Sequence, residues 1–167
     1  MKPKEAKLSH EELKRLLDYD PTTGKFTWRK DKCRIKAGSE AGFLDNGGYI
    51  RIRFKGNLHM AHRLAWFYVN KYFPEGDIDH INTDRIDNRI DNLRCATRAQ
   101  NCQNQKIRPT NTSGFKGVYR HSSGGFVSQI VVNRKHRYLG YFATAEEASL
   151  AYVKASEELH KDWGRIE

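Results

Sequence analysis

The sequence predicts a protein of the α+β class, built from two small modules. Its 167 residues are enough for one or two small hydrophobic cores. Strand-like alternation and helical apolar patterns both recur along the chain, and a polar stretch with Pro109 and no apolar periodicity interrupts them. We therefore expect a first domain at 1–104, a linker at 105–112 and a second domain at 113–167.

The first expected element is a helix followed by a strand. Ser9 and Glu12 have the spacing of a capping box, and the apolar face behind them predicts a helix running to about Asp18. A turn follows, after which Phe26 and Trp28 alternate with polar residues as in a strand. The chain is thus expected to leave the helix and enter a sheet within a few residues.

A second sheet region is expected at 41–61, followed by a helix at 62–72. The sheet is predicted from alternating apolar residues on either side of the turn-forming Lys55-Gly56-Asn57. The next stretch, 75–91, changes to acidic residues, arginines and asparagines. Such a composition is typical of a polar site and not of a hydrophobic core.

The rest of the chain predicts two capped helices with strands between them. Thr97 and Gln100 begin one helix, and Thr144 and Glu147 begin another that carries an apolar stripe. Three strands are expected between the two helices, at 115–121, 126–132 and 136–142. Three antiparallel strands packed on one helix would therefore form the second domain.

The charge of the chain points to a polyanionic partner. Lysine and arginine number 30 against 20 acidic residues, a formal net charge of +10. No acidic residue occurs between Asp91 and Glu146, whereas this tract contains many cations. Nucleic acid is the partner that this pattern favours, and a solvated basic face without a ligand is the alternative.

Cysteine spacing and hydropathy argue against a zinc-binding, disulfide-rich, membrane or secreted protein. The spacings of Cys33, Cys95 and Cys102 match neither a zinc site nor a disulfide framework. No apolar run approaches the ~20 residues that span a bilayer, and no signal-peptide-like segment opens the sequence. We expect a cytoplasmic protein, monomeric and without a membrane partner.

One set of polar residues has the composition of a hydrolytic site. Asp79 and His80 follow a short apolar approach, with Asn92 and then Asn101 further along the chain. An imidazole can deprotonate water near neutral pH, so His80 suits a general base for phosphodiester hydrolysis. A hard divalent cation prefers oxygen ligands such as Asp79 and the amide of Asn101.

The same region resembles a known family. The matching residues are His62-Arg63, Asp79-His80-Ile81-Asn82, Asp87-Asn88-Arg89, Asn92-Leu93-Arg94 and Asn101. Over 15–105 the chain is similar to the HNH (ββα-metal) endonucleases of phages and their introns. The resemblance implies a DNA-cleaving enzyme of the homing or phage type, in which His80 activates water.

The resemblance also implies roles for the other site residues. Asp79 and Asn101 would hold one metal ion, and Asn92 would brace the loop between two strands. Because Asn101 stands where another branch of the family has histidine, Mg²⁺ or Mn²⁺ is favoured over zinc. The implied setting is a bacterial or phage-infected cell.

Several arginines near this motif are candidate DNA contacts, and the sequence leaves two roles open for most of them. For Arg85, Arg89 and Arg94, the alternative to holding a phosphate is an ion pair with a nearby aspartate. The aspartates in reach are Asp84, Asp87 and Asp91. The candidate DNA contacts are Arg63, Arg85, Arg89 and Arg94. His62, just before an apolar helix, is expected to make a packing contact.

Residues 113–163 resemble the apetala-type DNA-binding domain of plant ethylene-response factors. The residues that carry the match are Ser113 to Val118, Phe126 to Ile130, Tyr138 to Phe142, Thr144 to Ala148 and Ala151-Tyr152. The resemblance implies three strands in the DNA major groove and a supporting helix behind them, although Phe126 and Tyr138 replace the usual tryptophans. The candidate DNA contacts here are Lys116, Arg120, His121, Gln129, Arg134, Lys135, Arg137 and Tyr138.

These observations together predict a metal-dependent endonuclease acting on double-stranded DNA. The alternative is a DNA-binding regulator with an inactive nuclease scaffold, against which the intact Asp79, His80 and Asn101 argue. An RNA-binding protein is less favoured, because neither an aromatic ribonucleoprotein motif nor a Gly-X-X-Gly clamp is present.

Overall fold

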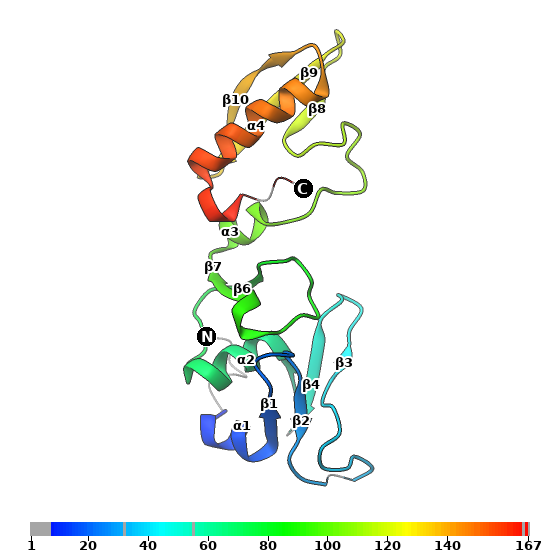
Figure 1. Ribbon diagram of the computed structural model, residues 1–167, viewed down its shortest axis with the longest axis vertical. Coiled ribbons are helices and arrows are strands. Elements are labelled where there is room, and N and C mark those ends of the chain that lie inside the picture. Colours follow the sequence, from blue (N-terminus) through cyan, green and yellow to red (C-terminus); the bar gives the residue numbers. More distant parts are fainter. Residues whose placement is uncertain (1–7, 32, 55, 165, 167) are drawn as a thin grey trace. The chain divides into compact units, whose positions relative to one another are not determined.

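The computed structural model describes residues 8–31, 33–54, 56–164 and 166. The chain divides into two compact units, Met1–Ala96 and Thr97–Glu167, and each is treated separately below (Figure 1). In the described residues, small antiparallel sheets combine with helices in both units. The predicted α+β class is confirmed.

The first helix is shorter than the sequence predicts. Helix α1 (His10–Leu16) begins at Ser9, whose hydroxyl oxygen accepts a hydrogen bond from the Glu12 N–H at 3.1 Å. It ends at Leu16 and not at Asp18, because the next residues form strand β1 (Leu17–Tyr19) against β2 (Phe26–Trp28). Burial of alternate residues of β1 favours the extended conformation over continued helix.

A three-stranded sheet and a helix complete most of the first unit. The sheet consists of β3 (Phe43–Leu44), β4 (Ile50–Phe54) and β5 (Asn57–Met60), as expected for 41–61. Helix α2 (Ala61–Asn70) stops earlier than predicted, where Lys71 adopts a left-handed conformation with φ 66°. Lys55 of the predicted turn lies outside the described residues.

The polar stretch after α2 forms a hairpin with a long loop. Strand β6 (Asp77–His80) pairs with β7 (Leu93–Ala96), and the 3₁₀ turn η1 (Ile90–Asn92) leads into the second strand. Ile78 and Leu93 belong to the core of this unit, which also contains residues of α1, α2, β1, β2 and β4. The core therefore fixes the two strands, while the loop between them is free to carry polar groups.

The second unit is a sheet backed by one helix. Short helix α3 (Arg98–Gln103) comes first, followed by β8 (Val118–Arg120), β9 (Phe126–Val132), β10 (Lys135–Phe142), α4 (Ala145–Leu159) and the 3₁₀ turn η2 (Lys161–Trp163). Of the three predicted capping boxes, the two in this unit are confirmed, at Thr97 and at Thr144. Helix α4 buries Ala148, Tyr152 and Ala155 against the sheet.

The stretch expected to be a linker contains no helix or strand among the described residues. It is nevertheless tied to the second unit, because the Lys116 ammonium donates to the carbonyl oxygens of Gln103 at 2.5 Å and Gln105 at 2.9 Å. These contacts link α3 to the second unit, which begins at Thr97. None of the described helices combines the length and apolar character needed to cross a membrane.

Candidate active site and nucleic-acid surface

His80 is the last residue of β6 and lies almost entirely inside the first unit. It is 5% exposed, and its Nε2 atom lies 3.3 Å from the side-chain oxygen of Asn88. Burial lowers the pKa of His80 below the ordinary histidine value, and the hydrogen bond with Asn88 opposes this effect. The imidazole is therefore favoured in its neutral form, which can accept a proton.

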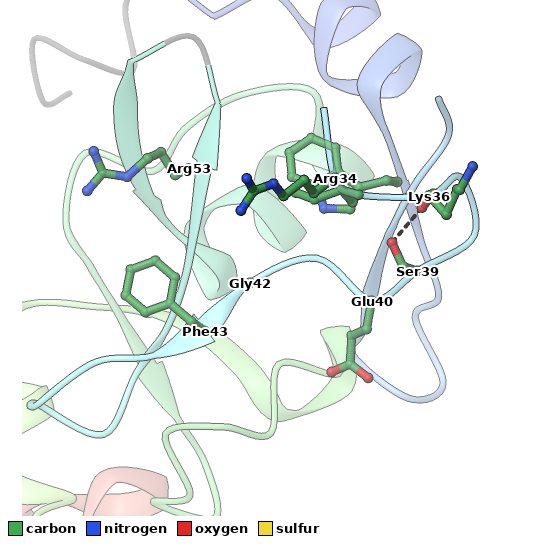
Figure 2. Close-up of a pocket in the computed structure, with 9 residues that line it drawn as sticks. Arg34, Lys36, Ser39, Glu40, Gly42, Phe43 and Arg53 are labelled. Carbon is green, nitrogen blue, oxygen red and sulfur yellow. Dashed lines mark hydrogen bonds between the residues drawn. The ribbon is translucent and has the colours of Figure 1, made fainter. Parts of the chain in front are cut away.

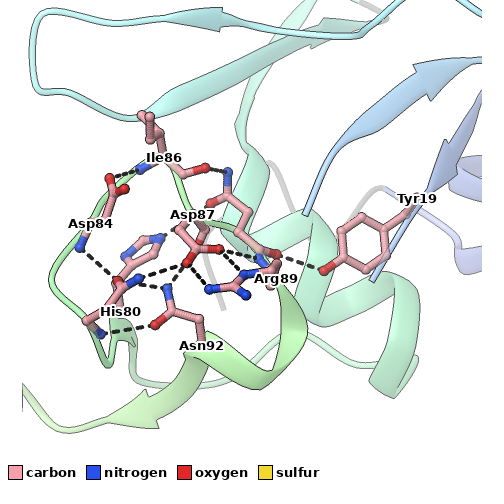
Figure 3. Close-up of polar contacts among 9 residues, drawn as sticks. Tyr19, His80, Asp84, Ile86, Asp87, Arg89 and Asn92 are labelled. Carbon is pink, nitrogen blue, oxygen red and sulfur yellow. Dashed lines mark hydrogen bonds and ion pairs between the residues drawn. The ribbon is translucent and has the colours of Figure 1, made fainter. Parts of the chain in front are cut away.

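Asn88 is itself held by the surrounding backbone and by the N-terminal sheet (Figure 3). Its carbonyl oxygen accepts a hydrogen bond from the Tyr19 hydroxyl at 2.7 Å, and its side-chain amide donates to the Ile86 carbonyl at 3.1 Å. Burial and the nearby Asp20 raise the pKa of Tyr19, so the hydroxyl stays a donor. Residues far apart in the sequence thus fix the partner of His80.

Asn92 links the two ends of the loop that closes the hairpin. Its side-chain oxygen accepts from the Asn82 N–H at 3.0 Å. Its amide group donates to the Asn82 side chain at 3.0 Å and to the Asp87 carbonyl at 2.8 Å. These contacts hold the loop that follows His80 in one conformation.

Asp79 faces Arg94 across the hairpin. The two residues are partners in the β6–β7 register, and Asp79 Oδ2 accepts a hydrogen bond from Arg94 Nε at 2.9 Å. Asp79 is only 4% exposed. Arg94 was expected to hold a phosphate or to pair with a nearby aspartate such as Asp91, and the structure shows instead that it orients the predicted metal ligand.

The other arginines near the motif also have protein partners. Arg89 pairs with Asp87 through two hydrogen bonds of 2.8 and 2.7 Å, which lower the pKa of Asp87 to about 2. Arg85 does not pair with Asp84: it donates to the Gly47 carbonyl at 2.8 Å and lies 5.1 Å from the centre of the Tyr49 ring.

The expectation that Arg63 contacts DNA is not supported by its placement. Arg63 is 4% exposed, and its guanidinium donates to the carbonyl oxygens of Pro74 and Gly76 at 3.0 Å each. It stabilises the chain between α2 and β6 from inside the unit. His62 makes the expected packing contact, with its ring 5.1 Å from that of His80.

The two predicted metal ligands lie in different units, Asp79 on β6 and Asn101 on α3. Among the described residues there is no group of three or more histidines, cysteines and acidic residues that could hold a metal ion. A carboxylate and an amide are oxygen donors, which suit a hard cation that keeps several waters and are unsuited to structural zinc. The chemistry of these donors fits the predicted Mg²⁺ or Mn²⁺.

In the second unit, the strand register decides which residues share the face turned away from α4. Gln129 pairs with Tyr138, and this pair alternates with residues such as Ile130 that face the helix. Tyr138 is 65% exposed. Gln129 and Tyr138 therefore lie on the open face of the sheet, and their contact with DNA stays a prediction.

Three other predicted contacts depart from that open face. Arg137 pairs with Ile130 and Lys135 with Val132, so the register places both on the helix side, at the exposed edge strand β10. Arg120 lies over the Phe126 ring at 5.6 Å. These cations therefore line the margin of the sheet and not its open face.

Turns hold two of the remaining candidates, and a third is engaged elsewhere. Arg134 occupies the β9–β10 turn with φ 64°, and His121 contacts the Ser123 hydroxyl at 2.6 Å in the β8–β9 turn. Lys116 is not presented to a ligand, because its ammonium holds the segment before β8. The DNA contact expected at Lys116 stays a prediction, and its ammonium would have to serve both the protein carbonyls and a phosphate.

The open face also carries residues that the sequence analysis missed. His136 pairs with Val131, and Tyr119 and Tyr141 both pair with Val127, which places all three on the side of Tyr138. Tyr119 and Tyr141 are exposed. The alternation along a strand is the signal that would have found His136 two residues before Tyr138.

Comparison with known proteins identifies the family that residues 59–103 match. Residues 59–103 match the family of HNH endonucleases, and this range contains Asp79, His80, Asn92 and Asn101. The chain thus carries an HNH endonuclease domain at 59–103.

Individual relatives match different parts of the chain. A protein of Acanthamoeba polyphaga mimivirus, named as an uncharacterized HNH endonuclease, is 27% identical over 145 residues, covering 86% of this chain and 67% of the relative. Protein 3.8 of Escherichia phage T7 is 40% identical over 58 residues, 34% of this chain and 48% of the relative. An ethylene-responsive transcription factor of Arabidopsis thaliana is 32% identical over 95 residues, 56% of this chain and 28% of the relative.

The chain thus spans less than half the length of two of these relatives. No solved structure matches it significantly.

Proposed function

We propose that this protein is a metal-dependent endonuclease that hydrolyses phosphodiester bonds in double-stranded DNA. The observation that carries the proposal is the pair Asp79-His80 at the end of β6, inside the segment that matches HNH endonucleases. The closing loop is held by Asn92 beside this pair. A hairpin held in one conformation suits a reaction that depends on the position of a single general base, here His80.

His80 acts as the general base in this proposal. Its lowered pKa keeps the imidazole neutral near pH 7, so that it accepts a proton from the attacking water. Asn88 and the loop held by Asn92 fix the imidazole. Water adds to the phosphorus, the bond to the 3′ oxygen breaks, and the expected products carry 5′-phosphate and 3′-hydroxyl ends.

Asp79 and Asn101 would hold one divalent cation, Mg²⁺ or Mn²⁺ in preference to zinc. When bound, such an ion neutralises charge on the phosphate and stabilises the leaving oxygen. Arg94 holds Oδ2 of Asp79 and thereby sets the direction of the carboxylate.

The second unit is proposed to supply DNA affinity and site preference as an apetala-type domain. The similarity to a plant ethylene-responsive factor supports this role, as does the absence of acids between Asp91 and Glu146. Arg134 gives a physical argument, because it occupies a left-handed turn position that favours glycine or asparagine. A cation kept there against backbone preference suggests a function for its charge.

The test is conversion of supercoiled plasmid to nicked or linear DNA in Mg²⁺, in Mn²⁺ and in excess EDTA. We expect conversion only with a divalent ion, and products that a ligase rejoins without prior phosphorylation. Salt-sensitive binding without any cleavage would refute the enzyme and favour the alternative, a DNA-binding regulator on an inactive nuclease scaffold.

A further inference from the structure

We propose that a groove beside β3 and β4 binds the sugar–phosphate backbone of duplex DNA, with Arg34 and Arg53 on phosphates and Phe43 against a sugar. The groove has a volume of about 480 Å³, and Trp28, Lys36 and Glu40 also line it (Figure 2). It lies outside the segment that matches HNH endonucleases. This inference builds on the proposed function, because it adds a DNA contact to the unit that carries His80.

The strand register places an aromatic and a cationic residue on the same outer face. Phe43 pairs with Arg51, so both side chains point to one side of the sheet, and Arg53 follows two residues later on that side. Ile52 between them is fully buried on the opposite face. Figure 2 shows Phe43 and Arg53 on neighbouring strands at the same end of the groove.

Cations outnumber acids among the described residues that line the groove, and of these cations Lys36 is paired with Asp31 at 3.8 Å. Throughout the part of the chain that the structure describes, neither Arg34 nor Arg53 has an ion pair, and both side chains are exposed. Among the described residues that line the groove, Glu40 is the only acid, and it is paired with Lys25 at 2.8 Å. Guanidinium groups without an internal partner match phosphate oxygens.

Phe43 adds the apolar part of the contact. Its ring is 48% exposed. An exposed aromatic ring between cations is unfavourable in water but suits a nucleic-acid backbone, where sugars alternate with phosphates. The combination therefore fits DNA better than a small anion, which would leave the ring uncovered.

Side-chain contacts within the first unit connect the strands beside the groove to the proposed active site. Arg85 of the catalytic loop bonds to Gly47 and stacks on Tyr49, immediately before β4. After β5, His62 packs on His80. A DNA strand held on β3 and β4 would thus be fixed relative to the hydrolytic hairpin, independently of the second unit.

The experiment compares R34A/R53A with the charge-matched control K14A/R15A, in which two exposed cations of α1 are removed. Binding of the full chain to a fluorescent DNA duplex is followed by anisotropy at several salt concentrations, in EDTA so that no cleavage occurs. We expect the salt slope of R34A/R53A to fall by about 1.8 units, roughly 0.9 for each lost phosphate contact, with the control unchanged. F43A should weaken binding and leave the slope unchanged.

An unchanged slope in R34A/R53A would overturn the proposal, and so would an equal fall in the control. A loss confined to an RNA duplex of the same sequence would overturn the assignment of DNA. Because binding in EDTA requires no hydrolysis, the result is independent of whether the chain cleaves DNA. Circular dichroism of each variant checks that the fold is retained.

Discussion

The β6–β7 hairpin and the C-terminal sheet differ in the exposure of their polar side chains. In the hairpin, Asp79, His80 and Asn92 are buried and each contacts a protein group. On the sheet, Tyr138 and Arg137 are exposed to solvent. The difference corresponds to the two tasks proposed, since bond cleavage needs groups fixed in one geometry and DNA affinity needs groups that a large ligand can reach.

This comparison also explains which arginines remain available to DNA. Arg63 is buried and Arg94 is half-buried in the first unit, and both donate hydrogen bonds to protein groups there. Arg89 is exposed, but its charge is neutralised by an ion pair with Asp87. Cations able to bind phosphate are therefore found at exposed positions of the two sheets, such as Arg53 on the central strand β4 and Arg137 on the edge strand β10.

The largest expected effect is the loss of cleavage in Asp79→Asn. The substitution keeps the shape of the side chain but removes the charge proposed to attract the metal, so cleavage should fall more than about 100-fold, to the level seen in EDTA. Titration with Mn²⁺ should show weaker metal binding. Wild-type cleavage by this variant would remove Asp79 from the metal site.

The second expected effect is destabilisation of the C-terminal sheet by Gly117→Ala. Gly117 has φ 71°, and a Cβ atom there would overlap the Tyr152 ring and lie 2.7 Å from the Gln129 carbonyl oxygen. We expect a loss of about 2–5 kcal/mol in the free energy of unfolding. Chemical denaturation measures the loss of unfolding free energy. A DNA-binding assay on the same variant should show a lower affinity.

Gly114→Ala is the matched control for this substitution. Gly114 also has a positive φ, of 79°, but nothing lies within 4 Å of its Cβ position. It should lose only the backbone term of about 1–2 kcal/mol. Equal losses in the two variants would show that packing against Tyr152 contributes nothing.

A smaller effect concerns pH. Because burial lowers the pKa of His80 below its ordinary 6.5, the neutral base persists to more acidic pH than a free histidine would allow. Cleavage should therefore fall with a midpoint below 6.5. The free energy of unfolding should also decrease as the pH falls, because His80 takes up a proton more readily in the unfolded chain than in the folded one. A midpoint above 6.5, measured with saturating Mg²⁺, would contradict the buried base.

Local signals in the sequence predicted most of the elements. Ser9, Thr97 and Thr144 each begin a helix, because a side-chain oxygen close to free N–H groups is a local feature. Strand β1 was missed, because Leu17 and Tyr19 are extended only through their pairing with β2 and burial in the core. Pairing across a sheet is not visible in a single segment.

The residues proposed for the site could be named from the sequence, but their contacts could not. Asp79, His80 and Asn92 could be named from their spacing, and the structure places them on one hairpin. The partners Tyr19 and Asn88 were not foreseen as contacts, because they depend on a hydrogen bond between residues far apart in the chain. Likewise, only the register of β9 and β10 shows that Arg137 lies on the helix side.

The most direct test of the account is a pair of variants studied by both cleavage and binding. One is His80→Ala. The other combines R134G, K135A and R137A, in which glycine suits the left-handed turn at Arg134. Plasmid nicking in Mg²⁺ and gel shift in EDTA are measured on the same preparations.

The account predicts opposite losses in the two variants. His80→Ala should lose about 10²–10⁴-fold in cleavage with unchanged binding. The triple variant should bind DNA more weakly, with a flatter salt dependence, yet cleave normally once enough protein is added. Wild-type cleavage by His80→Ala, or equal losses of cleavage and binding in both variants, would contradict the division of labour between the hairpin and the sheet.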